Sequence, residues 1–209
     1  VSEVFTPSVL ARLPEGDMAV GHVRYGTTGA NERDNAQPLL TKHRSCTMAL
    51  AHNGNLVNAA SLRARLERGG AIFHTTSDSE LISYIITRES LTAGSIELAV
   101  ANAMKTLDGA YSLVLLFGDR LIAVRDGNGF RPLCFGKTDE GDYVVASESC
   151  ALDAVDARFI RDVEPGEIVV FSKDGVKSID SGCKKSDFSP CVFEYIYFAR
   201  PDSIIDGHS

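Results

Sequence analysis

The chain has 209 residues, of which 44% are hydrophobic and 23% are charged. These proportions fit one globular domain, at most with an appendage, that is long enough to bury a core. The formal net charge of −7 provides no electrostatic attraction to nucleic acid or to an anionic membrane surface. The longest apolar run, LVLLF at residues 113–117, has the length of a strand and is too short to cross a bilayer.

The cysteine pattern bears on the cellular compartment. The chain has five cysteines and no C-x-x-C pair, which argues against a disulfide framework and against a zinc ribbon. Reduced thiols in a cytoplasmic protein are therefore predicted. The first residues lack a basic start followed by an apolar block, so no signal peptide is expected.

The first half of the chain predicts two strands followed by three helices. Alternating polarity at residues 19–25 and a short apolar run at 47–51 are typical of strands. Apolar residues then recur at helical spacing over residues 58–68, 77–90 and 95–109.

The ends of these helices are predicted from capping residues. Gly69 should end the first helix and Gly109 the third, because glycine tolerates the left-handed conformation that terminates helices. Ser77 should cap the second helix, and Glu80, three residues later, completes the pattern of a capping box.

The second half changes to short strand-like runs separated by turn residues. These runs lie at residues 110–117, 120–126, 132–136, 143–149 and 167–171. So many strands in so few residues predict antiparallel meanders rather than parallel β-α-β units. The expected fold class is therefore α+β, with helices covering antiparallel sheet.

The segment GHVRYGTTG, at residues 21–29, places an arginine beside glycines and threonines. We expect Arg24 at the end of a strand, where its guanidinium could hold a carboxylate through two parallel hydrogen bonds. Taken alone, the segment is explained more simply by a surface arginine beside a loop.

Residues 52–55, His-Asn-Gly-Asn, follow the apolar run. The side-chain amide of Asn53 and the backbone N–H of Gly54 are two donors that could converge as an oxyanion hole. Taken alone, an Asn-Gly turn between strand and helix is the simpler interpretation. His52 could act as a base, although a lone histidine is more often packed or hydrogen-bonded.

Asp78 falls in the first turn of the second predicted helix, where the helix dipole favours a carboxylate. It could also bind an ammonium group. Arg24, Asp78 and the Asn53–Gly54 pair would together bind a carboxylate, an ammonium group and an oxyanion. That combination describes an amino acid with an acyl side chain, and glutamine fits it.

Three motifs, GHVRYGTTG, AHNGNL and TTSDSE, occur in the order and spacing of a known family. Together with RDGNGFRPL, SESCALD, FIRDVEPGEIVV and the terminal CVFEYIYFARPDSIIDG, they resemble the glutaminase domain of the amidophosphoribosyltransferases. The resemblance covers essentially all 209 residues. It implies a four-layer αββα sandwich of the N-terminal-nucleophile hydrolase type, with antiparallel sheets.

The resemblance also implies roles for matching residues. Arg24 would bind the α-carboxylate of glutamine and Asp78 its α-ammonium group, while Asn53 and Gly54 would form the oxyanion hole. The family carries out glutamine hydrolysis with the thiolate of an N-terminal cysteine, whose own α-amine moves the proton. The ammonia then passes internally to phosphoribosyl pyrophosphate and gives 5-phosphoribosylamine.

Other residues and partners follow from the same resemblance. Tyr25 and Thr27 would belong to a loop that closes over glutamine. Cys191 matches a cysteine that in some members is one ligand of a [4Fe–4S] cluster in the intact enzyme, whereas one thiolate cannot hold a cluster by itself. We expect no cofactor in this chain, magnesium in the intact enzyme, and a homo-oligomer without nucleic-acid or membrane partners.

The chain departs from the family pattern in two places. It begins at Val1 without a Cys-Gly-Ile start. We therefore expect an N-terminally incomplete glutaminase domain at residues 1–190, a linker at 191–209 into an absent phosphoribosyltransferase domain, and no activity of the isolated chain. The second departure is Asp126-Gly127, where the family usually has Asp-Pro; with Asn128-Gly129, this segment predicts a hairpin turn rather than a phosphate-binding loop.

Two other functions stay open at this point. Glucosamine-6-phosphate synthase and asparagine synthetase share the arginine, Asn-Gly and aspartate pattern, but lack the YFARPDS ending. A non-catalytic module that binds glutamine or a partner protein is the other alternative.

Overall fold

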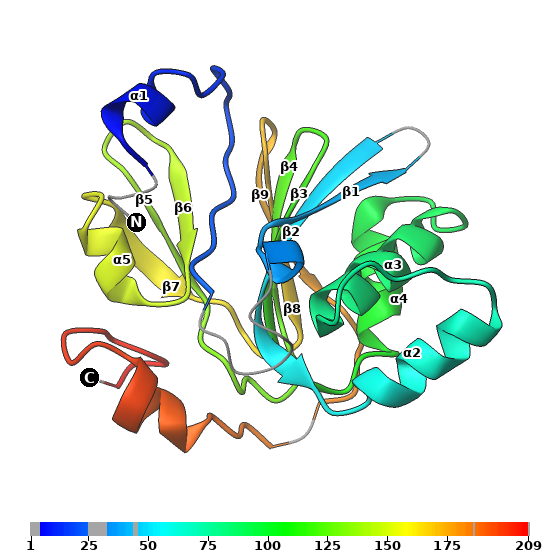
Figure 1. The fold of residues 1–209 in the computed structure, drawn as a ribbon. Helices are drawn as coiled ribbons and strands as arrows, with labels where there is room; N and C mark the ends of the chain where they lie inside the picture. The colour runs from blue at the N-terminus through cyan, green and yellow to red at the C-terminus, as the bar shows by residue number, and fades with distance from the viewer. Residues whose placement is uncertain (1–4, 25–32, 44–45, 186, 209) are drawn as a thin grey trace.

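The structure is a computed structural model that describes residues 5–24, 33–43, 46–185 and 187–208 (Figure 1). Two antiparallel sheets are stacked face to face, and helices cover the outer face of each. The expected α+β class and the four-layer αββα order are therefore confirmed. In the part of the chain that is described, no helix has the length and apolar character needed to cross a membrane.

The larger sheet is antiparallel throughout and follows the chain order except for one jump from β4 to β8. Its strands, in spatial order, are β1 (Leu39–His43), β2 (Cys46–Leu56), β3 (Gly109–Phe117), β4 (Arg120–Arg125), β8 (Glu167–Ser172) and β9 (Gly175–Asp180). The smaller sheet has the order β6 (Tyr143–Ala146), β5 (Cys134–Lys137) and β7 (Arg158–Asp162).

Three helices cover the outer face of the larger sheet and one short helix covers the smaller sheet (Figure 1). They are α2 (Ala59–Arg68), α3 (Asp78–Ser90) and α4 (Ile96–Met104) on the larger sheet, and α5 (Ser149–Asp153) on the smaller. Short helical turns occur at α1 (Pro7–Leu10), η1 (Arg33–Asn35) and η2 (Glu194–Phe198).

The alternation of side chains along the strands creates a separate core between each pair of layers. Along β4, Ile122 and Val124 face the helices α2 to α4 in the largest cluster of buried residues. Ala123, between them, faces the smaller sheet together with Phe135. A third small cluster, around Leu152, lies under α5.

Local signals placed the helices well but not all of their ends. Helix α2 ends at Arg68 before Gly69, and α3 begins after Ser77, as expected. Helix α4 ends at Met104, so the prediction that Gly109 terminates it is wrong. Gly109 instead begins β3, with φ +131°, and a Cβ there would lie 2.5 Å from the carbonyl oxygen of Asn55. Glycine is needed at position 109 because β2 and β3 approach each other closely there.

Two strand predictions need correction. Residues 19–24 alternate in exposure but form no strand, because no strand among the described residues pairs with their backbone. Residues 52–55 continue β2 rather than forming a turn. A turn is present at residues 127–128, but the predicted hairpin is wrong, because the strands that this turn joins, β4 and β5, lie in different sheets. A Cβ at Gly127 would lie 2.3 Å from the carbonyl oxygen of Lys184, which accounts for glycine at this position.

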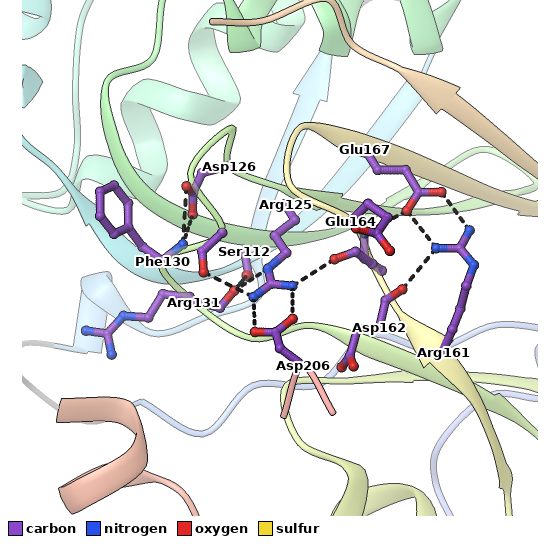
Figure 2. Close-up of polar contacts among 12 residues, drawn as sticks. Ser112, Arg125, Asp126, Phe130, Arg131, Arg161, Asp162, Glu164, Glu167 and Asp206 are labelled. Atoms are coloured by element: carbon purple, nitrogen blue, oxygen red, sulfur yellow. Dashed lines mark hydrogen bonds and ion pairs between the residues drawn. The ribbon is translucent and has the colours of Figure 1, made fainter. Parts of the chain in front are cut away.

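Residues 191–208 pack onto the body of the domain through buried polar contacts. The Arg125 side chain, 1% exposed, donates two hydrogen bonds to the Asp206 carboxylate, at 2.7 and 2.8 Å (Figure 2). Its remaining N–H groups donate to the carbonyls of Arg131, Val163 and Gly129. All five guanidinium N–H groups are thereby satisfied, which burial of an arginine requires.

Candidate active site

The candidate site lies where β2 extends beyond its neighbour β1. Pairing between the two strands stops at Leu39 opposite Leu50, whereas β2 continues to Leu56. From residue 51 to residue 56, the backbone groups of β2 that point toward β1 therefore have no strand partner among the described residues. Buried backbone groups must find other partners.

Alternate amides along this edge are held by side chains. The His52 N–H donates to Oε1 of Gln37 at 2.6 Å, and the Leu56 N–H donates to Oδ2 of Asp78 at 2.9 Å. Because backbone groups two residues apart in a strand point the same way, the N–H of Gly54 points to this same side. Gly54 is thus the middle of three amides, and the only one of them without an acceptor among the described residues.

The opposite neighbour of Gly54 offers it no acceptor either. Gly54 lies opposite Tyr111 of β3. The Tyr111 backbone N–H and C=O both pair with Asp126, on the far side of β3 from β2. Gly54 and Tyr111 are therefore a non-hydrogen-bonded pair, and no described residue accepts a hydrogen bond from the Gly54 N–H.

Position 54 admits only glycine. Its φ is +146°, and a Cβ built there would lie 2.0 Å from the carbonyl oxygen of Ala110. Any side chain would push β2 away from β3. The same absence of a side chain leaves the N–H of Gly54 unscreened.

His52 connects this strand to the start of α3. Its ring is buried, and Nδ1 lies 3.1 Å from Oγ of Ser79 and 3.6 Å from Oδ1 of Asp78. The second distance is an electrostatic contact rather than a hydrogen bond. Asn53, the next residue, projects from the opposite face of β2.

Asp78 is held ionised by its surroundings. Burial alone would raise its pKa, but the nearby His52 ring and the hydrogen bond from the Leu56 N–H outweigh burial and keep the pKa below its ordinary value. The first turn of α3 also favours a negative charge. A partly buried carboxylate of this kind is suited to hold a cationic group.

The start of α3 differs in detail from a capping box. The Ser77 hydroxyl accepts a hydrogen bond from the Ser79 N–H at 3.2 Å, so Ser77 is the cap. Glu80 accepts from the N–H groups of His74 and Thr75 instead of reaching back to Ser77. The segment before the helix is thereby folded against its first turn.

His22 ties the irregular segment before residue 25 to β2. Its Nε2–H donates to the carbonyl oxygen of His52 at 3.2 Å, which makes Nδ1 the acceptor nitrogen. Burial lowers the pKa of His22 below its ordinary value, so the ring is neutral at pH 7. Arg24, two residues later, is brought to the same region.

These elements enclose a cavity of about 610 Å³. Arg24, Asn53, Gly54 and Asp78, the four residues singled out from sequence, all line it. The structure therefore brings them together, while their roles in binding and catalysis remain predictions. Tyr25 and Thr27, the predicted loop residues, lie outside the described residues.

Several other residues of this cavity were not identified from sequence, and two of them connect its walls. Gln37 and Ser79 line it as well, and they bond each other. Gln37 lies in an unremarkable polar segment, and Ser79 is hidden inside a helix start. No local pattern marks either residue, because their importance arises from contacts between distant segments.

Metal-ligand chemistry has little support in the residues that can be placed. Among them, no group of three or more His, Cys, Asp or Glu side chains could hold a metal ion. Cys191 is a free thiol whose N–H donates to the Phe130 carbonyl at 3.1 Å. An iron–sulfur cluster would need further ligands, so the role of Cys191 stays a prediction.

The fold and the cavity can now be set beside known proteins. Residues 22–154 match the glutamine amidotransferase domain family. This match spans more than half of the chain, and the chain belongs to that family.

The chain is similar, more particularly, to amidophosphoribosyltransferases. Amidophosphoribosyltransferase 1 of the Arabidopsis thaliana chloroplast is 47% identical over 211 aligned positions, which cover the whole chain but 36% of that protein. A solved structure described as the allosteric regulatory enzyme of purine biosynthesis is 42% identical with a TM-score of 0.90, covering 99% of this chain and 43% of that one.

A second solved structure agrees. Glutamine phosphoribosylpyrophosphate amidotransferase from B. subtilis, solved with ADP and GMP, is 43% identical with a TM-score of 0.81 and covers 89% of this chain and 39% of that one. The expected resemblance is therefore confirmed. The chain spans less than half the length of each of these relatives.

Proposed function

We propose that this chain is the glutaminase part of an amidophosphoribosyltransferase. In this proposal it binds glutamine, releases ammonia from the side-chain amide, and delivers the ammonia to phosphoribosyl pyrophosphate for 5-phosphoribosylamine synthesis. The supporting observations are the family membership, the similarity to amidophosphoribosyltransferases over the whole chain, and the cavity. The proposal places the protein in de novo purine biosynthesis in the cytoplasm.

The observation that carries the proposal is the N–H of Gly54, which has no acceptor among the described residues and lies between two amides that do, at the cavity. Gly54 is half-buried at the cavity wall, so its N–H is accessible to a ligand that supplies an acceptor. The oxygen of a glutamine carboxamide, which becomes negative on nucleophilic attack, is such an acceptor. Asn53 would supply the second donor.

The charged groups would fix the other end of glutamine. The guanidinium of Arg24 would pair with the α-carboxylate, and the carboxylate of Asp78 would accept hydrogen bonds from the α-ammonium group. A site that binds both charged groups and the side-chain oxygen selects an amino acid by the distance between them. It would place the carboxamide carbon within reach of a nucleophile.

The bond changes follow those of the family. A cysteine thiolate attacks the carboxamide carbon, the carbonyl oxygen becomes an oxyanion, and the C–N bond breaks as the nitrogen gains a proton and leaves as ammonia. Water then cleaves the thioester and gives glutamate. None of the described residues that line the cavity is a cysteine. The described residues would therefore bind glutamine and stabilise the oxyanion, and the family nucleophile would complete the reaction.

Calorimetry with L-glutamine and its product L-glutamate tests the binding roles in the protein that carries this chain. We expect saturable binding, weakened at least about tenfold in Arg24→Ala and in Asp78→Asn, because each substitution removes a charge-assisted contact. Arg65→Ala is the matched control, since Arg65 is an exposed residue of α2 that does not line the cavity. Equal affinities in all four proteins would contradict the proposed roles.

A further inference from the structure

The polar side chain of Gln37 lies at the junction between β1, β2 and α3. We propose that Gln37 is a positioning residue, which fixes the Gly54 N–H relative to the carboxylate of Asp78. The inference rests on the proposed function, because it assigns to Gln37 the alignment of two groups that bind glutamine. Gln37 itself is not proposed to touch the reacting atoms.

The oxygen and the nitrogen of the Gln37 side-chain amide form hydrogen bonds to different elements of the site. Oε1 accepts the His52 N–H at 2.6 Å, two residues before Gly54 on β2. Nε2 donates to the hydroxyl oxygen of Ser79 at 3.2 Å, one residue after Asp78 in α3. One rigid amide plane therefore spans the strand that carries the oxyanion donor and the helix turn that carries the carboxylate.

The register explains why a side chain, rather than another strand residue, makes this bond. Leu39 pairs with Leu50, so continuing the ladder by two residues would put position 37 opposite His52. If backbone pairing continued further along β2, the next acceptor would take the Gly54 N–H. The Gln37 side chain satisfies His52 and ends the ladder there, which leaves the next amide for a ligand.

The two hydrogen-bond partners of Gln37 are buried, so the position of its side chain matters for both. His52 is 4% exposed and Ser79 is 1% exposed, so loss of the half-buried Gln37 amide would leave polar groups of two buried residues without this partner. Loss of both bonds would leave the end of β2 joined to the start of α3 only through the Leu56–Asp78 and His52–Ser79 hydrogen bonds, and we expect the strand to shift relative to the helix. A shift of about 1 Å in a catalytic group can lower turnover by roughly a hundredfold.

Gln37→Met tests this inference, because methionine has a similar length and lacks both polar contacts. In the protein that carries this chain, we expect kcat for glutamine hydrolysis to fall about tenfold and KM to rise about fivefold. The kcat effect reflects the Gly54 donor, and the KM effect reflects Asp78. Thr41→Val is the matched control, since Thr41 also joins β1 to α3, through a 2.5 Å hydrogen bond to Ser83, but does not line the cavity.

A purely structural role predicts a different pattern. In that case Gln37→Met would lower the melting temperature as Thr41→Val does, while the folded fraction would keep the wild-type KM and kcat. Wild-type kinetic constants in folded Gln37→Met would overturn the inference. If the methionine variant does not fold, Gln37→Asn replaces it, since its side chain is one methylene too short to reach both partners, and the same outcomes apply.

Amide hydrogen exchange separates this inference from the proposed function. We expect the His52 amide to exchange at least about tenfold faster in Gln37→Met than in Thr41→Val, because its acceptor is lost. Gln37→Glu retains an acceptor and should restore slow exchange. A wild-type protein without glutamine turnover would refute the proposed function, whereas unchanged exchange in Gln37→Met would refute the role of Gln37.

Discussion

The end of β2 and the surroundings of Arg125 are both buried polar regions, and they differ in how completely their groups are satisfied. Every N–H of the Arg125 guanidinium has an acceptor, and its carboxylate partner Asp206 is bound through both oxygens (Figure 2). At the end of β2 the Gly54 N–H has no acceptor among the described residues, and His52 Nε2 is buried without a partner there.

The number of polar groups left without partners distinguishes a structural network from a candidate binding site. A fully paired cluster has no capacity left for a ligand, so its contribution is to hold elements together. Unpaired donors at a cavity reduce stability until a ligand occupies them. On this basis the Arg125 cluster attaches the C-terminal segment, and the end of β2 is the proposed substrate-binding site.

The largest expected effect comes from breaking the satisfied cluster. Arg125→Met leaves the carboxylate of Asp206, which is 12% exposed, and three carbonyls without their donors, and should lower the free energy of unfolding by about 3–5 kcal/mol. Urea denaturation measures this change. Arg120→Met, on the same strand, is the control: Arg120 is 40% exposed and should cost no more than about 1 kcal/mol.

If Arg125→Met were as stable as Arg120→Met, the comparison between the two regions would fail. The folded fraction of Arg125→Met should also retain wild-type affinity for glutamate. A loss of affinity beyond the loss of folded protein would mean that the cluster belongs to the binding site.

The second effect should appear in turnover with little change in stability. The Asn53 side-chain amide makes no hydrogen bond to the residues described, so Asn53→Ala should alter the free energy of unfolding by less than about 0.5 kcal/mol. Glutamine hydrolysis by the protein that carries this chain should nevertheless fall by roughly 10²–10³ in kcat. Steady-state kinetics and urea denaturation on one preparation test both parts.

Asn55→Ala is the matched control for Asn53→Ala. Asn55 is an exposed residue on the same face of β2 and does not line the cavity. Its substitution should leave kcat unchanged. Equal losses in both variants would show that this edge of β2 matters only for the integrity of the strand.

The smallest expected effect is on the pH dependence of stability, and it comes from Asp162. This carboxyl group is influenced by Arg125 and by the Asp206 carboxylate that Arg125 already binds. Burial, and then the neighbouring Asp206 carboxylate, raise the pKa of Asp162 from 3.8 to about 6. Because the folded pKa is the higher one, the group supports folding most below pH 4, and that contribution is lost as the pH rises through about 6.

Asp162→Asn should therefore stabilise the protein at pH 7, by about 1 kcal/mol after allowance for solvent screening of this half-buried group. The advantage should disappear below about pH 4, where the wild-type carboxyl is neutral in both states. Urea denaturation across this pH range measures the difference. Asp139→Asn, at an 87% exposed position, should show no such dependence.

Local chemistry in the sequence predicts much of this fold. Helix α3 is the clearest case, since Ser77 caps it and Leu81, Ile82, Ile85 and Ile86 are buried on one face. The strands β3, β4 and β8 also follow from their apolar runs. These signals depend on neighbours a few residues apart.

The errors occur where partners are distant in the chain. Residues 19–24 have the alternation of a strand, but a strand also needs a hydrogen-bonded neighbour, which they lack. β9 was not predicted, and its exposed side chains give no apolar signal. The four ligand-binding candidates were correctly grouped by their chemistry, whereas Gln37 became visible only through its contacts.

The unequal lengths of β1 and β2 carry one further consequence. An overhanging strand presents its donors with the rigidity of a sheet, so recognition here needs no flexible loop to supply the amide of residue 54. It also makes the site sensitive to the length of the hairpin: because Leu39 pairs with Leu50, lengthening β1 at its start by four paired residues would place a backbone acceptor opposite residue 54 and occupy its N–H. We therefore expect insertions near residues 36–38 to impair the site even where the hydrophobic core is unaffected.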